Sequence, residues 1–150
     1  YGPRQSARAV IPTIITQLLA ESGDIRLGSL NTARDLSYVL DICNGFIALA
    51  KCDEAVGKEI NIGSGEEISI GKLVNLIKEL INSDAKIIFE KQRKRPDQSE
   101  VEQLVCDNSL IKSLTGWKPE IALREGLLMT IEWFRNRNNL NKYKSDIYNI

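Results

Sequence analysis

The chain of 150 residues has 20 basic and 20 acidic side chains, so its formal net charge at pH 7 is zero. Apolar residues make up 43% and charged residues 27%, which is the balance of a folded globular protein and not of a disordered one. With no net charge, the chain has no long-range field that would attract DNA, RNA or an anionic membrane. It also lacks an apolar run of the roughly 18 residues that a membrane span needs. We therefore expect neither a nucleic-acid partner nor a membrane partner.

The sequence contains no histidine. This excludes Ser-His-Asp and Cys-His catalysis, as well as every metal site built on imidazole. Cys43, Cys52 and Cys106 are too far apart to form a C-x-x-C pair, which argues against a zinc site and a redox dithiol. We expect them to be buried free thiols of a protein in the reducing cytoplasm.

Apolar residues at helical spacing predict four longer helices and one short helix. The first follows the turn-forming Tyr1–Gln5 segment, starts near Pro12 and stops at Gly23. Ser69 is a good N-cap for the third, whereas Ala122 is a poor one for the last, whose first turn should fray. The second, third and last helices cover residues 39–50, 70–80 and 123–134, and the short helix runs from Asn108 to a C-terminal Gly116.

Short apolar runs between these helices predict strands over 25–27, 59–63, 86–90 and 104–106. The polar segment 91–103 is expected to be a loop. Strands alternating with helices predict an α/β architecture. We assign residues 1–137 to one domain and expect the Asn- and Lys-rich segment 138–150 to be loosely held.

Several short motifs follow one another in the order that is typical of one family. They are Tyr1–Gln5 (compare N-x-Y-G-P-R), 27–36 (L-G-N-L-x-x-x-R-D-W), 38–41 (Y-V-x-D), 61–63 (N-I-G), 95–101 (R-P-x-E-V) and 115–127 (L-G-W-x-P…L-x-E-G-L). The chain thus resembles the extended short-chain dehydrogenases/reductases (SDRs) that act on nucleotide sugars, the NAD-dependent epimerases and dehydratases. Within that family it looks closest to the 4,6-dehydratases of the legionaminic acid pathway, which act on GDP-linked N-acetylglucosamine. It departs from the pattern at Leu36, where the family has an aromatic residue, and at Ser29, where it has Asn.

The resemblance implies the C-terminal, substrate-binding portion of an extended SDR, with the last elements of a Rossmann-like sheet and without the cofactor half. We therefore expect that the chain was cut from a longer polypeptide. The family's reaction uses NAD to oxidise the sugar at C4, eliminates water across C5 and C6, and returns the hydride. The full-length parent would bind NAD(P) and form a homodimer.

We expect no catalytic residue and no bound cofactor in this chain alone, because neither the Gly-rich turn nor the family's Y-x-x-x-K motif occurs in it. The turn Gly63-Ser64-Gly65 is expected to be structural, since the adjacent Glu66 and Glu67 would repel phosphate.

By motif position, the resemblance assigns Arg34 and Arg95 to the pyrophosphate of a GDP- or UDP-linked sugar. The planar guanidinium fork matches phosphate oxygens in geometry and charge. Two alternatives remain open from the residues alone: Arg34 could pair with Asp35 or another carboxylate, and Arg95 could belong to a solvated basic loop.

The family's positions around the base and ribose correspond to Val10, Leu27, Ser29 and Asn61. Val10 also belongs to the apolar stripe of the first helix, which favours a core role at least as strongly. Asn61 could instead satisfy backbone groups at a strand end.

The leading hypothesis is therefore the substrate-binding part of a nucleotide-sugar 4,6-dehydratase, with a 4-epimerase as the alternative. A non-catalytic interaction module that binds nucleic acid through residues 91–95 is a different kind of alternative, disfavoured by the zero net charge. A third alternative is an inert remnant, whose open strand edges and exposed apolar surface would favour association.

Overall fold

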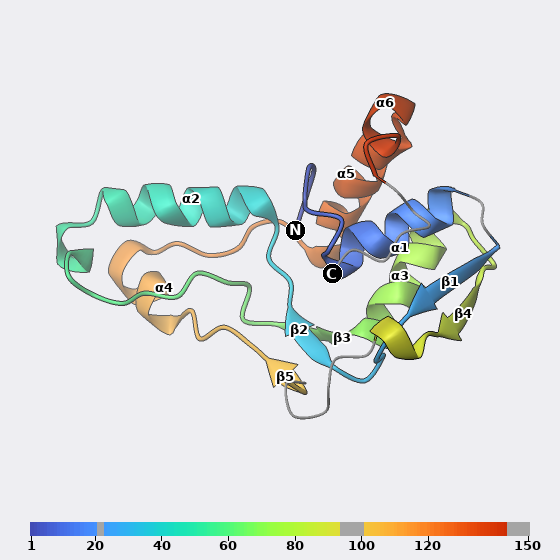
Figure 1. Ribbon diagram of the computed structural model, residues 1–150. Helices are drawn as coiled ribbons and strands as arrows, with labels where there is room; N and C mark the ends of the chain where they lie inside the picture. Colours follow the sequence, from blue (N-terminus) through green and yellow to red (C-terminus); the bar gives the residue numbers. More distant parts are fainter. Residues whose placement is uncertain (21–22, 94–100, 144–150) are drawn as a thin grey trace.

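The computed structural model describes residues 1–20, 23–93 and 101–143. Three helices, α1 (Val10–Leu19), α3 (Ile70–Ile81) and α5 (Leu123–Arg135), pack on one another. Beside them lies a parallel pair of strands, β1 (Asp24–Leu27) and β4 (Lys86–Phe89), with Asp24 paired to Lys86 and Leu27 to Phe89 (Figure 1). The expected α/β architecture is confirmed.

A second, three-stranded sheet has β2 (Ala33–Asp35) at its centre. One neighbour is the antiparallel β3 (Glu67–Ser69), and the other is the parallel β5 (Gln103–Leu104). Two of these strands, β2 and β3, are not predicted by the sequence, because three residues are too few to show an alternating pattern.

The remaining helices are α2 (Val39–Ala50), α4 (Ser109–Thr115), α6 (Arg137–Leu140) and the single 3-10 turns η1 (Asp53–Ala55) and η2 (Lys91–Arg93). Helices α2 and α4 lie side by side in an arm that extends away from the three-helix core (Figure 1).

The hydrophobic core lies where the apolar faces of α1, α3 and α5 meet β1. The predicted stripes of the first and third helices both point into it. Its fully or nearly fully buried members are Ile11, Ile14, Ile15, Leu18, Ile25, Leu27, Ile70, Leu73, Val74, Ile77, Leu127, Ile131 and Phe134. Val10 packs against the edge of this cluster and remains partly exposed. The core role considered for Val10 is therefore present in part.

Local capping explains where several helices begin and end. The Ser69 side chain accepts a hydrogen bond from the Lys72 amide and so caps α3, as expected. Ala122 precedes α5 without any side-chain cap. Gly116 ends α4 with a φ of 70°, a left-handed conformation that residues other than glycine adopt at a cost.

One predicted strand is wrong. Residues 59–63 form no strand, because no other segment among the described residues pairs with them. Strand structure needs a partner for its backbone groups, so an apolar run alone does not create it.

The end of the described chain is anchored. Residues 137–140 form α6, and the Tyr143 hydroxyl donates a hydrogen bond of 2.9 Å to the Gln5 carbonyl. The Tyr143 ring also contacts Phe134 edge-on, with centroids 4.9 Å apart. Of the segment expected to be loosely held, residues 138–143 are thus attached to the core, and residues 144–150 lie outside the described residues.

The three cysteines are free, as expected, but they are not all buried: Cys43 is exposed, and the other two are half-buried. No group of Cys, Asp and Glu side chains in the described part of the chain could hold a metal ion. Within the same residues, no helix combines the length and the apolarity needed to cross a membrane.

Within the arm, the buried carboxylate of Asp41 holds helix α2 to the chain that follows α4. This carboxylate accepts hydrogen bonds from the amides of Glu120 and Ile121, each 3.1 Å long. The Trp117 indole N–H donates to the Asp41 carbonyl at 3.2 Å. The start of α2 is therefore fixed to the segment between α4 and α5.

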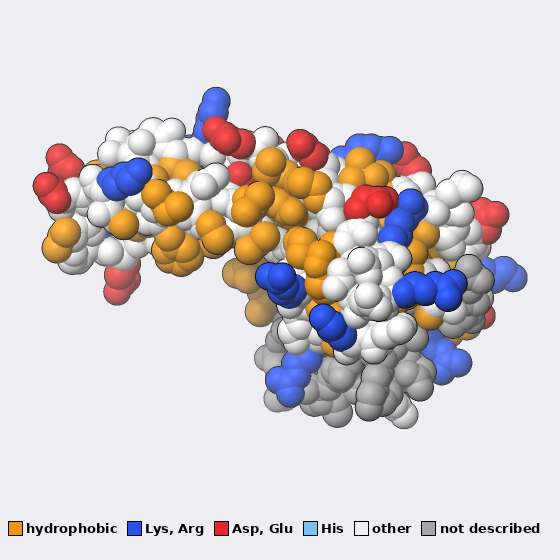
Figure 2. Space-filling view, turned by 90° about the horizontal axis from the view of Figure 1, so that it is seen from above, with side chains coloured by type: hydrophobic (Ala, Val, Ile, Leu, Met, Phe, Trp, Pro, Cys, Tyr) orange, Lys and Arg blue, Asp and Glu red, His pale blue; other side chains and the backbone are white. Residues whose placement is uncertain are grey.

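The outer side of α2 is apolar, the reverse of the usual pattern for a surface helix. Leu40 and Ile47 are each 53% exposed and Phe46 is 63% exposed. The only charged residue of the helix, Asp41, is buried. Hydrophobic side chains accordingly gather along the arm (Figure 2). We define Val39, Leu40, Cys43, Phe46 and Ile47 as the α2 stripe.

An exposed apolar stripe of this kind should make the isolated chain self-associate. Phe46→Lys places a charge in its middle and is expected to shift the sedimentation-velocity distribution towards the monomer, without lowering the melting temperature. The matched control is Phe89→Lys, since Phe89 is 60% exposed but lies on β4. Equal effects of the two variants would show that the α2 stripe is not the associating surface.

The two caps allow a paired stability test. Ser69→Ala removes the hydrogen bond to the Lys72 amide and should lower the free energy of unfolding by about 1 kcal/mol. Ala122→Ser adds a cap where none exists and should raise it by about 0.5–1 kcal/mol. Urea unfolding followed by circular dichroism measures both, and a stabilising Ser69→Ala or a destabilising Ala122→Ser would contradict the assignment of these positions.

Candidate functional site

A cavity of about 280 Å³ opens at the carboxyl ends of the parallel strands β1 and β4. Ligands of α/β proteins bind preferentially at this end of parallel strands. The cavity collects residues from the start of α1, the end of β1, strand β2, the start of α3 and η2. They are Arg8, Ala9, Val10, Thr13, Leu27, Gly28, Ser29, Thr32, Arg34, Ile70 and Arg93. We call this the arginine cavity.

Four of the six residues that the resemblance assigned to substrate line the arginine cavity together. They are Val10, Leu27, Ser29 and Arg34. Asn61 does not: it is exposed and lines a separate hollow beside Gly63 and Cys106. The sixth, Arg95, lies outside the described residues.

The guanidinium of Arg34 is oriented by backbone carbonyls. Its Nη1 donates to the Ala33 carbonyl at 2.7 Å and, more weakly, to the Glu102 carbonyl at 3.5 Å. The side chain is half-buried and lines the cavity. Arg34 does not pair with Asp35, because the Asp35 carboxylate is hydrogen-bonded to Ser37, Ser64, Gly65 and Cys106 instead. The other half of that alternative, a pair with a different carboxylate, stays open.

Two further arginines line the cavity that the sequence did not single out. Arg8 comes from the turn before α1 and is exposed, and Arg93 comes from η2, directly after β4. Arg93 also forms an ion pair with Glu90. Their signals were present in the sequence, since Arg8 stands two residues before Val10 and Arg93 two residues before Arg95.

Other features of the cavity suit an anion with an apolar attachment. The amino ends of α1 and α3 both reach it, through Val10 and Ile70, and helix amino ends favour negative charge. Val10 and Leu27 give an apolar wall, while Thr13, Ser29 and Thr32 supply hydroxyl groups. The arginine cavity can therefore receive an anionic group beside a flat apolar one.

The turn Gly63-Ser64-Gly65 does not fit the pyrophosphate of a dinucleotide. Its Ser64 and Gly65 amides donate to the Asp35 carboxylate at 3.1 and 2.8 Å, so they are not available to a phosphate. This supports the interpretation of the turn as structural, and we derive no cofactor chemistry from it.

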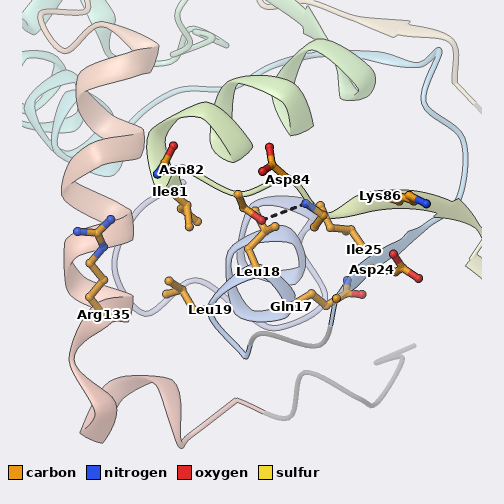
Figure 3. A pocket seen from close by; sticks show the side chains of 13 residues that line it. Gln17, Leu18, Leu19, Asp24, Ile25, Ile81, Asn82, Asp84, Lys86 and Arg135 are labelled. Atoms are coloured by element: carbon orange, nitrogen blue, oxygen red, sulfur yellow. Dashed lines mark hydrogen bonds between the residues drawn. The ribbon is translucent and has the colours of Figure 1, made fainter.

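A larger hollow of about 730 Å³ lies at the opposite, amino ends of β1 and β4 (Figure 3). Its charged side chains are of both signs: Asp24, Asp84, Lys86 and Arg135. The Gln17 amide is already used, because its Oε1 accepts from the Arg26 amide at 2.9 Å and thereby holds β1 against α1. This hollow offers volume but no convergent set of groups, so we place the candidate site in the arginine cavity.

Known proteins are similar to this chain in sequence and in fold. The profile of the family described as GDP-mannose 4,6 dehydratase matches residues 1–130. The UDP-glucuronate 4-epimerase of Thermodesulfobacterium geofontis is 33% identical over 147 residues, which cover 97% of this chain and 43% of that protein.

Solved structures of related enzymes have the same fold over this region. An epimerase from Methanothermobacter thermautotrophicus has 28% identity and a TM-score of 0.84, over 95% of this chain and 43% of that one. The UDP-glucuronic acid 4-epimerase of Bacillus cereus, solved in complex with UDP-glucuronic acid and NAD, has 26% identity and a TM-score of 0.82, over 91% of this chain and 43% of that one. The chain thus spans less than half the length of these relatives.

The carboxylate of Asp35, the residue that follows Arg34, is surrounded by hydrogen-bond donors. Burial by itself raises the pKa of Asp35, but hydrogen bonds from the Ser64 hydroxyl and from the amides of Gly65, Cys106 and Ser64 outweigh it and hold the pKa below its ordinary value. Such a group stabilises the fold above its unfolded pKa of about 4, and that stabilisation is lost as the pH falls through the lower, folded pKa.

We expect the free energy of unfolding to decrease as the pH drops below about 4 and this decrease to be smaller in Asp35→Asn, whose side chain does not titrate. Part of the decrease should persist in the variant, because the Ser109 amide also lowers the pKa of the exposed Asp107. Urea unfolding between pH 3 and 7 measures the difference. Parallel pH curves for the two proteins would contradict the prediction.

Proposed function

Since the chain belongs to the GDP-mannose 4,6-dehydratase family of extended SDRs, the nucleotide-sugar epimerases and dehydratases, we propose that it holds the nucleoside diphosphate of a nucleotide sugar. The observation that carries this proposal is the convergence of Arg8, Arg34 and Arg93 on one cavity. Arg95, two residues beyond Arg93 in the sequence, is proposed as a further contact.

The chemistry of the arginine cavity supports this ligand class. A pyrophosphate carries two negative charges, which guanidinium groups and helix amino ends can neutralise and orient. The wall formed by Val10 and Leu27 suits the face of a base, and Ser29 can hydrogen-bond to a base or ribose. The cavity is at the lower end of the volumes that enclose a small ligand, so it would take only part of a nucleotide sugar.

For the whole protein we propose a 4,6-dehydratase that uses NAD, with GDP-linked N-acetylglucosamine as the substrate suggested by the motifs at residues 5–12 and 95–101. When bound, NAD would take a hydride from the sugar and return it. A 4-epimerase is a second candidate, because the relatives named above include UDP-sugar 4-epimerases. The described residues of this chain would contribute substrate binding and not the hydride transfer.

Arg34→Ala tests the proposal directly. Isothermal titration of the chain with GDP- and UDP-linked sugars should show saturable binding that the substitution weakens roughly ten- to hundredfold, since a hydrogen bond to a charged group contributes about 1.5–3 kcal/mol. Arg8→Ala should weaken binding in the same direction, by less, because that side chain is more exposed.

The control is Arg124→Ala. Arg124 forms an exposed ion pair with Glu79 at 2.8 Å and lies on α5, away from the cavity. Its removal should leave the dissociation constant unchanged. Absence of saturable binding by the unmodified chain, or equal weakening by Arg34→Ala and Arg124→Ala, would overturn the proposal.

A further inference from the structure

The central strand β2 presents two charged neighbours to opposite sides. Side chains alternate along a strand, so consecutive residues point to opposite faces. Arg34 accordingly lines the arginine cavity, whereas Asp35 lines the separate hollow beside Gly63 and Cys106. What holds Asp35 therefore also determines where Arg34 points.

The Asp35 carboxylate accepts five hydrogen bonds. Oδ1 accepts from the Ser37 hydroxyl at 3.1 Å, the Ser64 amide at 3.1 Å and the Ser64 hydroxyl at 2.6 Å. Oδ2 accepts from the Gly65 amide at 2.8 Å and the Cys106 amide at 3.2 Å. A carboxylate has about four lone-pair sites, so this one is saturated and has no capacity left for Arg34.

Four of these five hydrogen bonds come from the segments next to β3 and β5, the two neighbours of β2. Gly65 stands two residues before β3, with a φ of 79° that directs its amide, and Cys106 stands two residues after β5. One side chain thus joins the ends of all three strands. Antiparallel β3 and parallel β5 are only three and two residues long, too short to set a register by backbone pairing alone.

The placement of β5 matters to Arg34 because Glu102, directly before that strand, contacts β2 at both Ala33 and Arg34. The Glu102 carbonyl accepts the Ala33 amide at 2.7 Å and the Arg34 guanidinium at 3.5 Å. If β5 moves relative to β2, the guanidinium loses one of the carbonyls that orient it.

We propose that Asp35 is a positioning residue for Arg34: by tying β3 and β5 to β2, it aims the guanidinium into the arginine cavity without touching the ligand. This inference rests on the proposed function in so far as Arg34 binds phosphate. Its structural part, the coupling of Asp35 to the Ala33–Glu102 contact, is independent of any ligand.

Asp35→Asn is the sharpest probe, because it keeps the size of the side chain but replaces one acceptor oxygen with an amide. In either orientation the new NH₂ group faces N–H or O–H donors that had been satisfied. A double-mutant cycle with Arg34→Ala separates positioning from general destabilisation. The dissociation constants of GDP- and UDP-linked sugars are measured well below the melting temperature of each variant.

Asp35→Asn should raise the dissociation constant at least about fivefold in the unmodified background and less than about twofold when Arg34 is already Ala, since the effect is transmitted through that side chain. Equal factors in both backgrounds would show that Asp35 acts on folding only. If instead Arg34→Ala itself leaves binding unchanged, or nothing binds, the proposed function fails and the second measurement decides the inference.

The second measurement is amide hydrogen exchange without ligand. In Asp35→Asn, the Ala33 amide should lose protection together with those of Gly65 and Cys106, while amides of α5 keep theirs. Faster exchange at Gly65 and Cys106 with an unchanged Ala33 would overturn the inference, whatever the binding result.

Two further variants serve as controls for this test. Asp107→Asn makes the same chemical change in the same hollow, but Asp107 accepts from the Ser109 amide at the start of α4, so it should leave Ala33 and binding unaffected. Ser64→Ala removes one donor and keeps the carboxylate, so it should reproduce the Asp35→Asn effects in weaker form if the latter protein unfolds.

Discussion

The carboxylate of Asp35 is the constraint on which the geometry of the three-stranded sheet depends. It lies at the end of the central strand and is bonded to the 64–65 turn and to the chain leaving β5. Neither the parallel nor the antiparallel pairing in this sheet is long enough to specify itself. A single half-buried cluster of hydrogen bonds therefore fixes the strand register, as longer ladders do in larger sheets. The low pKa of Asp35 follows from the same bonds, because each favours the ionised form.

The arrangement also separates two tasks that stand next to each other in the sequence. Asp35 faces inward to the backbone, and Arg34 faces the cavity at the carboxyl ends of β1 and β4. The family relationship accounts for the pairing of these residue types in an R-D motif, and the geometry supplies a physical reason for it. Because the motif is divided between the two faces of a strand, its members cannot neutralise each other.

The elements with strong local signals were predictable from the sequence. Helix α3 has a capping Ser69 and an unbroken apolar stripe, and it begins where those signals place it. Strands were less predictable, because pairing depends on residues far away: 59–63 has a strand-like composition but no partner among the described residues, while β2 has partners but only three residues. The site shows the same division. Motif positions led to Arg34, Val10, Leu27 and Ser29, whereas Arg8 and Arg93 join them only through the folding of α1 and η2 around one cavity.

The arginine cavity is assembled from segments that lie more than eighty residues apart in the chain, from Arg8 to Arg93. No short stretch of the unfolded polypeptide contains such a set, so an occupant of the cavity would bind the native state and not the denatured one. Occupancy and folding are then thermodynamically linked: free ligand at a hundred times its dissociation constant adds about 2.7 kcal/mol to the free energy of unfolding. For a domain whose total stability is of the order of 5–15 kcal/mol, such a ligand would then supply a substantial part of the free energy that keeps the chain folded.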